Sequence, residues 1–194
     1  MQTPSKLKRE FYANPDCAEL AQLLLGKTLV VDKPGQPRRM GRIVETEAYL
    51  GPHDLAAHSS KGLTPRTQVM FDEPGHVYVY LIYGMHHCMN VVGGPVGSGS
   101  GVLLRGLEPI EGIELPSQGP GRLCKALGVD RSDYGQDLCA DTIFLLDTPL
   151  RQDEVIASSE RIGVHYAGDW AQVPLRFYIK NNAFVSKVSN KKAT

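Results

Sequence analysis

The stretch IVETEAY at residues 43–49 decides how this chain folds, because it has the composition of a buried strand and yet contains two glutamates. Its β-branched start and the Gly51-Pro52 dipeptide that follows it predict a strand that ends in a turn. A strand of this composition helps to build a core. The two carboxylates therefore need a separate explanation.

Glu45 and Glu47 would lie on one face of this strand together with Ile43 and Tyr49, because side chains alternate along a strand. A carboxylate among apolar side chains is unfavourable unless it is paired, hydrogen-bonded or hydrated. Proteins often hold charged groups in such places at sites that carry out chemistry. The alternative is an edge strand that presents both glutamates to solvent, and the strand pattern alone leaves the two interpretations open.

Length and composition favour one domain. The chain has 194 residues, of which 42% are hydrophobic, and we predict a single domain over residues 1–194 with one core. We expect loosely held termini at residues 1–13 and 189–194. The sequence contains neither an apolar run that could cross a bilayer nor a signal-peptide segment at its start, so we expect an intracellular protein without a membrane partner.

Charge and cysteine usage argue against several classes of protein. The 21 basic and 21 acidic residues cancel, which gives no global sign of a polyanionic partner. The four cysteines form no Cys-x-x-Cys pair, as a zinc knuckle or redox motif would require. The run His86-His87-Cys88 would alternate between the faces of a strand and so cannot converge on one ion. A metal-dependent hydrolase that uses His53, Asp54, His58 and Glu47 is kept as an alternative hypothesis.

Helical and strand patterns are mixed along the chain without strict β-α-β alternation, which predicts an α+β fold with a mostly antiparallel sheet. A helix is expected from Asn14, as N-cap, to a stop at Gly26, with shorter helices at 64–71 and 122–127. A turn at Gly84-Met85 joins the first two strands of a meander. Strands are expected at 28–31, 43–49, 76–83, 86–92, 102–107, 142–146, 161–164 and 175–179.

Three tyrosines occur in the segment YVYLIY at residues 78–83. Tyr78 and Tyr80 would share a strand face, and Tyr83 would end the strand beside a glycine. Cross-strand aromatic pairs explain such residues without any further function. A tyrosine face can also stack on a planar ring, and a tyrosine at a hairpin tip can act as a wedge. Packing is the favoured explanation for Tyr78, whereas both explanations stay open for Tyr80 and Tyr83.

Arg105 lies in the otherwise apolar segment 102–107 and needs an anionic partner if it is buried. Glu45 and Glu47 are the candidates, since they are the other charges in strand-like surroundings. The pair could be purely structural. It could also hold a water molecule for catalysis.

Several short motifs follow one another in a fixed order from about residue 11 to residue 187. They are ETEAY (45–49), AAHS (56–59), TPR (64–66), YVY (78–80), YGM (83–85), MN (89–90), LLR (103–105), GPGRLC (119–124) and PLRFY (174–178). Together they resemble the alkyladenine (3-methyladenine) DNA glycosylase family. The resemblance covers nearly the whole chain, and the order of many motifs makes it far more specific than any one of them.

The resemblance implies a monofunctional DNA glycosylase that removes alkylated or deaminated purines from double-stranded DNA and leaves an abasic site. It implies a mixed fold around a curved, mostly antiparallel sheet flanked by helices, and it implies neither a metal nor another cofactor. We expect a monomer. The short segment between Glu111 and Gly119 and the lack of a long N-terminal extension are similar to bacterial members, for which the cytoplasm or nucleoid is expected. A damaged-DNA binding module without catalysis is the alternative function.

The resemblance also implies roles for individual residues. Glu47 would be the general base that activates the attacking water, and Arg105 would help to hold that water. This fits the chemistry, because a positioned base typically contributes about 10²–10⁴-fold. The same charge would stabilise a positive, oxocarbenium-like sugar. No general acid is identified in the sequence.

The remaining implied roles concern binding of the damaged nucleotide. Tyr49 and Tyr80 would stack on the flipped base beside His58, and Asn90 would crowd the two-amino group of normal guanine. Tyr83 would enter the minor groove and fill the gap, which lowers the few kcal/mol that flipping costs. Contacts with the DNA backbone are expected from Arg66, Met85, Arg122 and Lys125.

Overall fold

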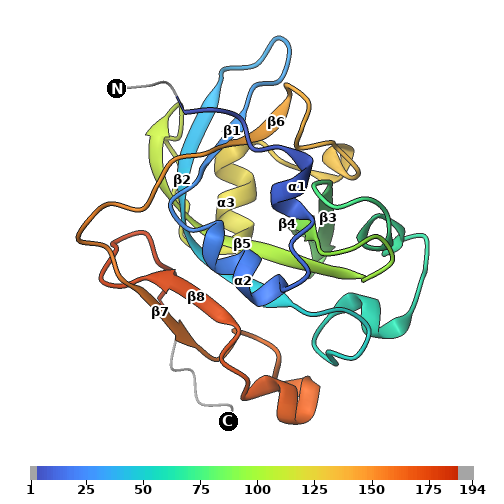
Figure 1. Ribbon diagram of the computed structural model, residues 1–194. Coiled ribbons are helices and arrows are strands. Elements are labelled where there is room, and N and C mark those ends of the chain that lie inside the picture. Colours follow the sequence, from blue (N-terminus) through green and yellow to red (C-terminus); the bar gives the residue numbers. More distant parts are fainter. Residues whose placement is uncertain (1–3, 188–194) are drawn as a thin grey trace.

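The computed structural model describes residues 4–187, and strand β2 (Arg39–Tyr49) lies at the centre of its antiparallel sheet (Figure 1). One edge of β2 pairs along its length with β5, while the other edge pairs first with β1 and then with β8. The main path of the sheet is β3-β4-β5-β2-β1-β6, and β7 joins through β8. The strands are β1 (Thr28–Val31), β3 (Val77–Ile82), β4 (His86–Gly93), β5 (Ser100–Glu111), β6 (Ile143–Leu146), β7 (Ile156–Ser159) and β8 (Arg176–Ile179).

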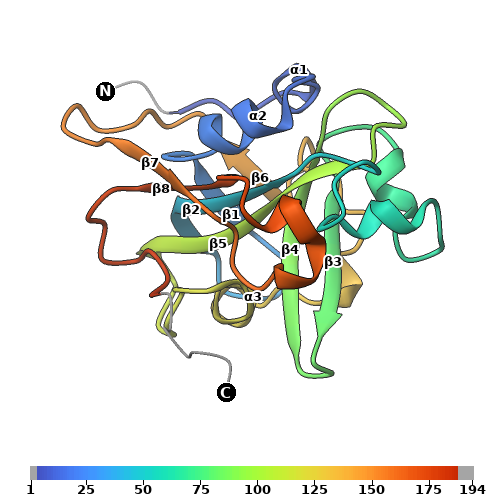
Figure 2. The same ribbon diagram turned by 90° about the horizontal axis from the view of Figure 1, so that it is seen from below.

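Helices cover both sides of this curled sheet, so the α+β fold with a mostly antiparallel sheet is confirmed. Figure 2 shows α2 and α3 on opposite sides of β2 and β5. The helices are α1 (Arg9–Tyr12), α2 (Cys17–Leu23) and α3 (Pro120–Leu127), with 3-10 turns η1 (His58–Lys61), η2 (Gln68–Phe71), η3 (Arg131–Asp133) and η4 (His165–Ala171). No helix within residues 4–187 is long and apolar enough to span a membrane.

A bulge in β2 divides the strand into two parts. The pairing with β5 shifts between Ile43 and Glu45, where Ile43 faces Leu107 and Glu45 already faces Gly106. Ile43 belongs to the apolar core, and the extra residue in β2 interrupts the regular alternation before Glu45. Beyond the bulge β2 leaves β1 and pairs with β8.

The edge-strand interpretation of Glu45 and Glu47 is wrong. The segment that carries them is paired on both edges, and both glutamates are 0% exposed. Such a burial requires hydrogen-bonding partners for every carboxylate oxygen.

The N-terminal segment is more ordered than expected. Leu7 and Tyr12 are buried, and Arg9 of α1 donates hydrogen bonds to Asp137 and to the carbonyl of Pro74. Helix α2 is capped by Asp16, whose carboxylate accepts from two backbone N–H groups, and the expected cap Asn14 instead accepts from the N–H of Asp16. The expected loose tail at 189–194 lies outside the described residues.

Two predicted elements are wrong and one strand was not predicted. Residues 161–164 form a turn, because Gly163 has a φ of +80°, which an extended strand does not allow. Strand β7 has the sequence Ile-Ala-Ser-Ser, which carries little strand propensity, and its pairing with β8 stabilises it. The helix expected at 64–71 is reduced to η2, since Thr64 and Thr67 hydrogen-bond to each other in a turn.

We predict that Gly51→Ala destabilises the fold at the end of β2. Gly51 has a φ of +105°, and an added Cβ would lie 2.5 Å from the carbonyl oxygen of Ser98. We expect the free energy of unfolding, measured by urea titration, to fall by about 2–3 kcal/mol.

Gly35→Ala is the matched control, because Gly35 has a φ of +72° in an exposed turn and no atom within 4 Å of the added Cβ. Its loss should be limited to the backbone contribution of about 1 kcal/mol. Equal losses in the two variants would contradict a steric conflict at Gly51.

Candidate active site

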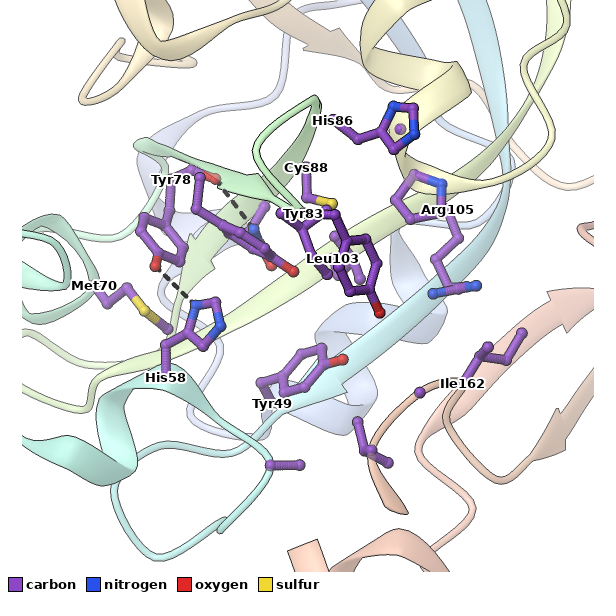
Figure 3. Close-up of a pocket in the computed structure, with 18 of the residues that line it drawn as sticks. Tyr49, His58, Met70, Tyr78, Tyr83, His86, Cys88, Leu103, Arg105 and Ile162 are labelled. Carbon is purple, nitrogen blue, oxygen red and sulfur yellow. Dashed lines mark hydrogen bonds between the residues drawn. The ribbon is translucent and has the colours of Figure 1, made fainter. Parts of the chain in front are cut away.

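A cavity of about 540 Å³ opens between the β3–β4 hairpin, the end of β2 and the segment before η4. Tyr78 and His58 lie on one side of it and Arg105 and Ile162 on the other, with Tyr49 between them (Figure 3). The lining includes Tyr49, Ala56, His58, Met70, Tyr78, Tyr80, Tyr83, His86, Cys88, Asn90, Leu103, Arg105, Pro120, Gly121, Ile162, Gly163, Val164 and Tyr166.

Glu47 accepts hydrogen bonds from three groups around this cavity. The backbone N–H of Ile162 donates to Oε1 at 2.7 Å, the hydroxyl of Tyr49 donates to Oε2 at 2.9 Å, and Nη1 of Arg105 donates to Oε2 at 3.3 Å. All three partners are donors, and together they fix both oxygens of the carboxylate in place.

Glu45 has a different role, because its oxygens accept from donors on three segments. Arg176 Nε donates at 2.7 Å and Arg105 Nε at 3.2 Å, both to Oε1. The backbone N–H and the hydroxyl of Ser186 each donate at 2.7 Å. Glu45 therefore holds β2, β5, β8 and the segment after β8 together.

Arg105 bridges the two glutamates, so both predicted partners are present. Burial opposes the charged guanidinium, but Glu47 and Glu45 outweigh it and raise the pKa of Arg105 above its ordinary value. The guanidinium consequently stays charged beside Glu47. Arg105 therefore links the carboxylate of Glu45 to that of Glu47.

Aromatic rings form the walls of the cavity. The rings of His58 and Tyr80 lie 4.5 Å apart, and Nδ1 of His58 is 2.8 Å from the hydroxyl of Tyr78. Burial, and then the charge of Arg66, lower the pKa of His58 to about 4, so its ring is neutral at pH 7. Burial, and then the charge of Glu47, raise the pKa of Tyr49 well above its ordinary value, which keeps its hydroxyl a donor.

Asn90 closes the inner side of the cavity on β4. Its side chain is buried and donates from Nδ2 to the carbonyl oxygen of Tyr78 at 3.1 Å. This hydrogen bond fixes the amide orientation between β3 and β4. A rigid polar group at this depth can distinguish the edges of bound rings.

The hairpin between β3 and β4 presents Tyr83 at its tip. The central residues of the turn are Tyr83 and Gly84, with φ values of +54° and +69°, and the N–H of Met85 donates to the carbonyl of Ile82. The expected turn at Gly84-Met85 is therefore displaced by one residue. This I′-type geometry favours asparagine where Tyr83 stands, because bulky residues at positive φ are strained.

Strain of this kind, of about 1–3 kcal/mol, tends to occur at functional positions. The Tyr83 side chain is 84% exposed and that of Met85 is 70% exposed. The turn thus holds two large apolar side chains in solvent beside the cavity mouth.

The four residues expected at the DNA backbone are all exposed. Arg66 stacks its guanidinium 5.4 Å from the ring of Tyr80, on the rim of two neighbouring cavities. Arg122 and Lys125 are exposed on α3, whose first residues line the main cavity. Met85 lies on the hairpin tip.

The metal-ligand hypothesis does not fit the geometry. Both oxygens of Asp54 accept from Arg161, and the ring of His53 packs on Trp170. Within residues 4–187, no three His, Cys, Asp or Glu side chains gather closely enough to hold an ion.

Sequence reasoning missed several groups at the site. The N–H of Ile162 is a backbone donor and leaves no signal in a sequence. Arg161 lies in a turn and not in the predicted strand. Tyr78 packs in an apolar cluster as predicted, and its hydroxyl also lies 2.8 Å from Nδ1 of His58. A buried arginine in a turn could have been found only from its contacts.

Comparisons with known proteins agree with this geometry. The family model of methylpurine-DNA glycosylase matches residues 10–183. A Myxococcus xanthus protein is 51% identical over 93% of this chain and 93% of its own length. A Legionella pneumophila protein is 52% identical over 94% of this chain and 98% of its own length.

Both relatives carry names that assign them provisionally as 3-methyladenine DNA glycosylases. The matched region includes the cavity and every residue that contacts Glu47. The chain therefore belongs to the methylpurine-DNA glycosylase family and is a hydrolase that acts on N-glycosyl bonds.

Proposed function

We propose that this enzyme flips an alkylated or deaminated purine out of duplex DNA and hydrolyses its N-glycosidic bond with a water molecule activated by Glu47. The observation that carries the proposal is Glu47 itself, a fully buried carboxylate whose three hydrogen-bond donors, on Tyr49, Arg105 and Ile162, all belong to residues that line the cavity. The product would be an abasic site.

The chemistry follows from charge and position. A water molecule near Glu47 would lose its proton to the carboxylate as it attacks the anomeric carbon, and Arg105 would help to orient it. Positive charge develops on the sugar at the same time, and the negative carboxylate stabilises it in a water-poor site. Glu45 is saturated by its own donors and takes no part in this step.

The aromatic walls favour a cationic base. Tyr49 and Tyr80 line the cavity, and the faces of tyrosine rings attract positive charge, which alkylation gives to a purine. His58 is neutral at pH 7 and adds no repulsion. A cationic purine leaves without a proton, so the reaction needs no general acid for such a lesion.

Base flipping would depend on the hairpin tip. A target base inside the stack cannot be reached, and a wedge that fills its place lowers the penalty of extrusion. Tyr83 directly follows β3 in the chain, and its exposed ring lines the cavity. The alternative, a damaged-DNA binding module, would use the same rings but release no base.

Replacing Glu47 with Gln should abolish excision and retain lesion binding. We expect the single-turnover rate of base release from duplexes with 7-methylguanine, hypoxanthine or ethenoadenine to fall by about 10²–10⁴-fold, because the base is lost. Glu108→Gln, a similar change on β5 away from the cavity, should leave the rate unchanged. Full activity of Glu47→Gln would refute the assigned role.

Replacing Tyr83 with Ser should weaken binding to lesion duplex at the flipping step. Loss of a stacking ring should reduce the affinity by about 1–3 kcal/mol, measured as Kd by fluorescence anisotropy. Tyr83→Phe keeps the ring and should bind like the unaltered protein. Unchanged binding by Tyr83→Ser would count against the wedge.

The ring of His58 should titrate near pH 4, with no change between pH 6 and 8, when its imidazole resonances are followed by NMR. The unfolded chain binds this proton at its ordinary pKa of 6.5, so the stability contributed by neutral His58 is lost as pH falls from 6.5 towards 4. His58→Gln should flatten this part of the stability curve. A midpoint at the ordinary value would contradict the buried, neutral ring.

A further inference from the structure

Arg161 and Asp54 form a fully buried ion pair beside the site. Both side chains are 0% exposed, Nη1 of Arg161 donates to Oδ2 of Asp54 at 2.6 Å, and Nη2 donates to Oδ1 at 2.9 Å. Neither residue lines the cavity. A buried pair of this kind needs a reason, because apolar side chains of similar volume often stabilise a fold equally well.

Arg161 hydrogen-bonds to two segments of the chain, the end of β2 and η4. It donates to the carbonyl oxygen of Ala48 at 2.9 Å, one residue after Glu47 in β2, and to that of Trp170 in η4 at 3.2 Å. The next residue in the chain is Ile162, whose N–H donates to Glu47. The guanidinium therefore sets the distance between that N–H and the carboxylate.

Arg161 also supports a second donor to Glu47. Its guanidinium carbon lies 4.8 Å from the centre of the Tyr49 ring, whose hydroxyl donates to Oε2. Arg161 thus contacts or directly precedes two of the three residues that donate to Glu47, namely Tyr49 and Ile162.

Asp54 connects Arg161 to the loop on the opposite side of the cavity. Besides the two bonds from Arg161, its carboxylate accepts from the N–H of Leu50 at 3.1 Å and from the N–H of Ala56 at 3.0 Å. These bonds shape the loop that carries Ala56 and His58 to the cavity.

We infer that the Arg161–Asp54 pair is the positioning device for Glu47, acting through the Ile162 N–H and the Tyr49 hydroxyl. The inference rests on the proposed function of Glu47 as the base. Arg161 and Asp54 are positioning residues, since they touch neither the cavity nor the reacting atoms. Their loss should slow the chemical step more than it weakens DNA binding.

The test removes the pair as a whole. Removing one partner would leave an uncompensated buried charge, whereas removing both avoids it. The single-turnover excision rate of the double variant Arg161→Gln/Asp54→Asn should fall by about ten- to a hundredfold, as for a slightly misplaced catalytic group, and by a larger factor than its Kd for lesion duplex rises.

The matched control is Arg42→Gln/Glu154→Gln. Here too a buried arginine, Arg42 on β2, pairs with a carboxylate. Neither residue of this pair lines the cavity or contacts a group around Glu47. The control should excise at the unaltered rate.

Ile162→Pro removes the backbone donor, and it is compared with Ile162→Ala, because Ile162 also lines the cavity and alanine loses that side chain but keeps the N–H. The comparison decides the question even if the double variant does not fold. Gly163 follows with a φ of +80°, the pattern of a type II turn, and proline suits the position before that glycine. The substitution removes the N–H but keeps the ion pair. We expect about a tenfold lower excision rate with unchanged Kd, as for a small loss of alignment.

The outcomes separate this inference from the proposed function. If Glu47→Gln is fully active, the proposed function is wrong and the inference falls with it. If Glu47→Gln is inactive while folded Ile162→Pro and the double variant excise at the unaltered rate, the proposed function stands and the positioning role is overturned.

Discussion

The burial of two carboxylates on one strand is the constraint on which the rest of this structure depends. Glu45 and Glu47 are both inaccessible to solvent, so every donor near them must come from the protein. Arg105 serves both, and Arg176 serves Glu45. The sheet must therefore bring β5 and β8 against the same part of β2, and the charges hold these strands in register.

The bulge in β2 makes this arrangement possible. Before the bulge, β2 pairs with β1 and contributes to the apolar core, and beyond it the strand turns to β8. A bulge increases the local twist and re-aims the side chains that follow. Glu47 then lies directly behind three residues that line the cavity, whereas Glu45, two residues earlier, is enclosed by strands and by Ser186.

The site combines rigid and strained parts. The side chains near Glu47 are held by hydrogen bonds within the sheet and by the segment from Arg161 to η4, which suits a reaction that depends on fixed charges. The strained backbone lies at the exposed hairpin tip, where Tyr83 adopts a positive φ. The donors to Glu47 and the strained hairpin residue Tyr83 line the same cavity.

The sequence by itself determined the antiparallel α+β class, most strands of the sheet, and the aromatic and charged residues that gather at the cavity. The class and the strands follow from alternation and turn residues, which are local properties, whereas the site residues were identified through the resemblance of the ordered motifs to a family. The sequence did not determine the turn at 162–163, the capping by Asp16, or the different hydrogen-bond partners of Glu45 and Glu47. Only the tertiary structure decided those, because a backbone N–H such as that of Ile162, and an ion pair such as Arg161–Asp54, bring together residues more than a hundred positions apart.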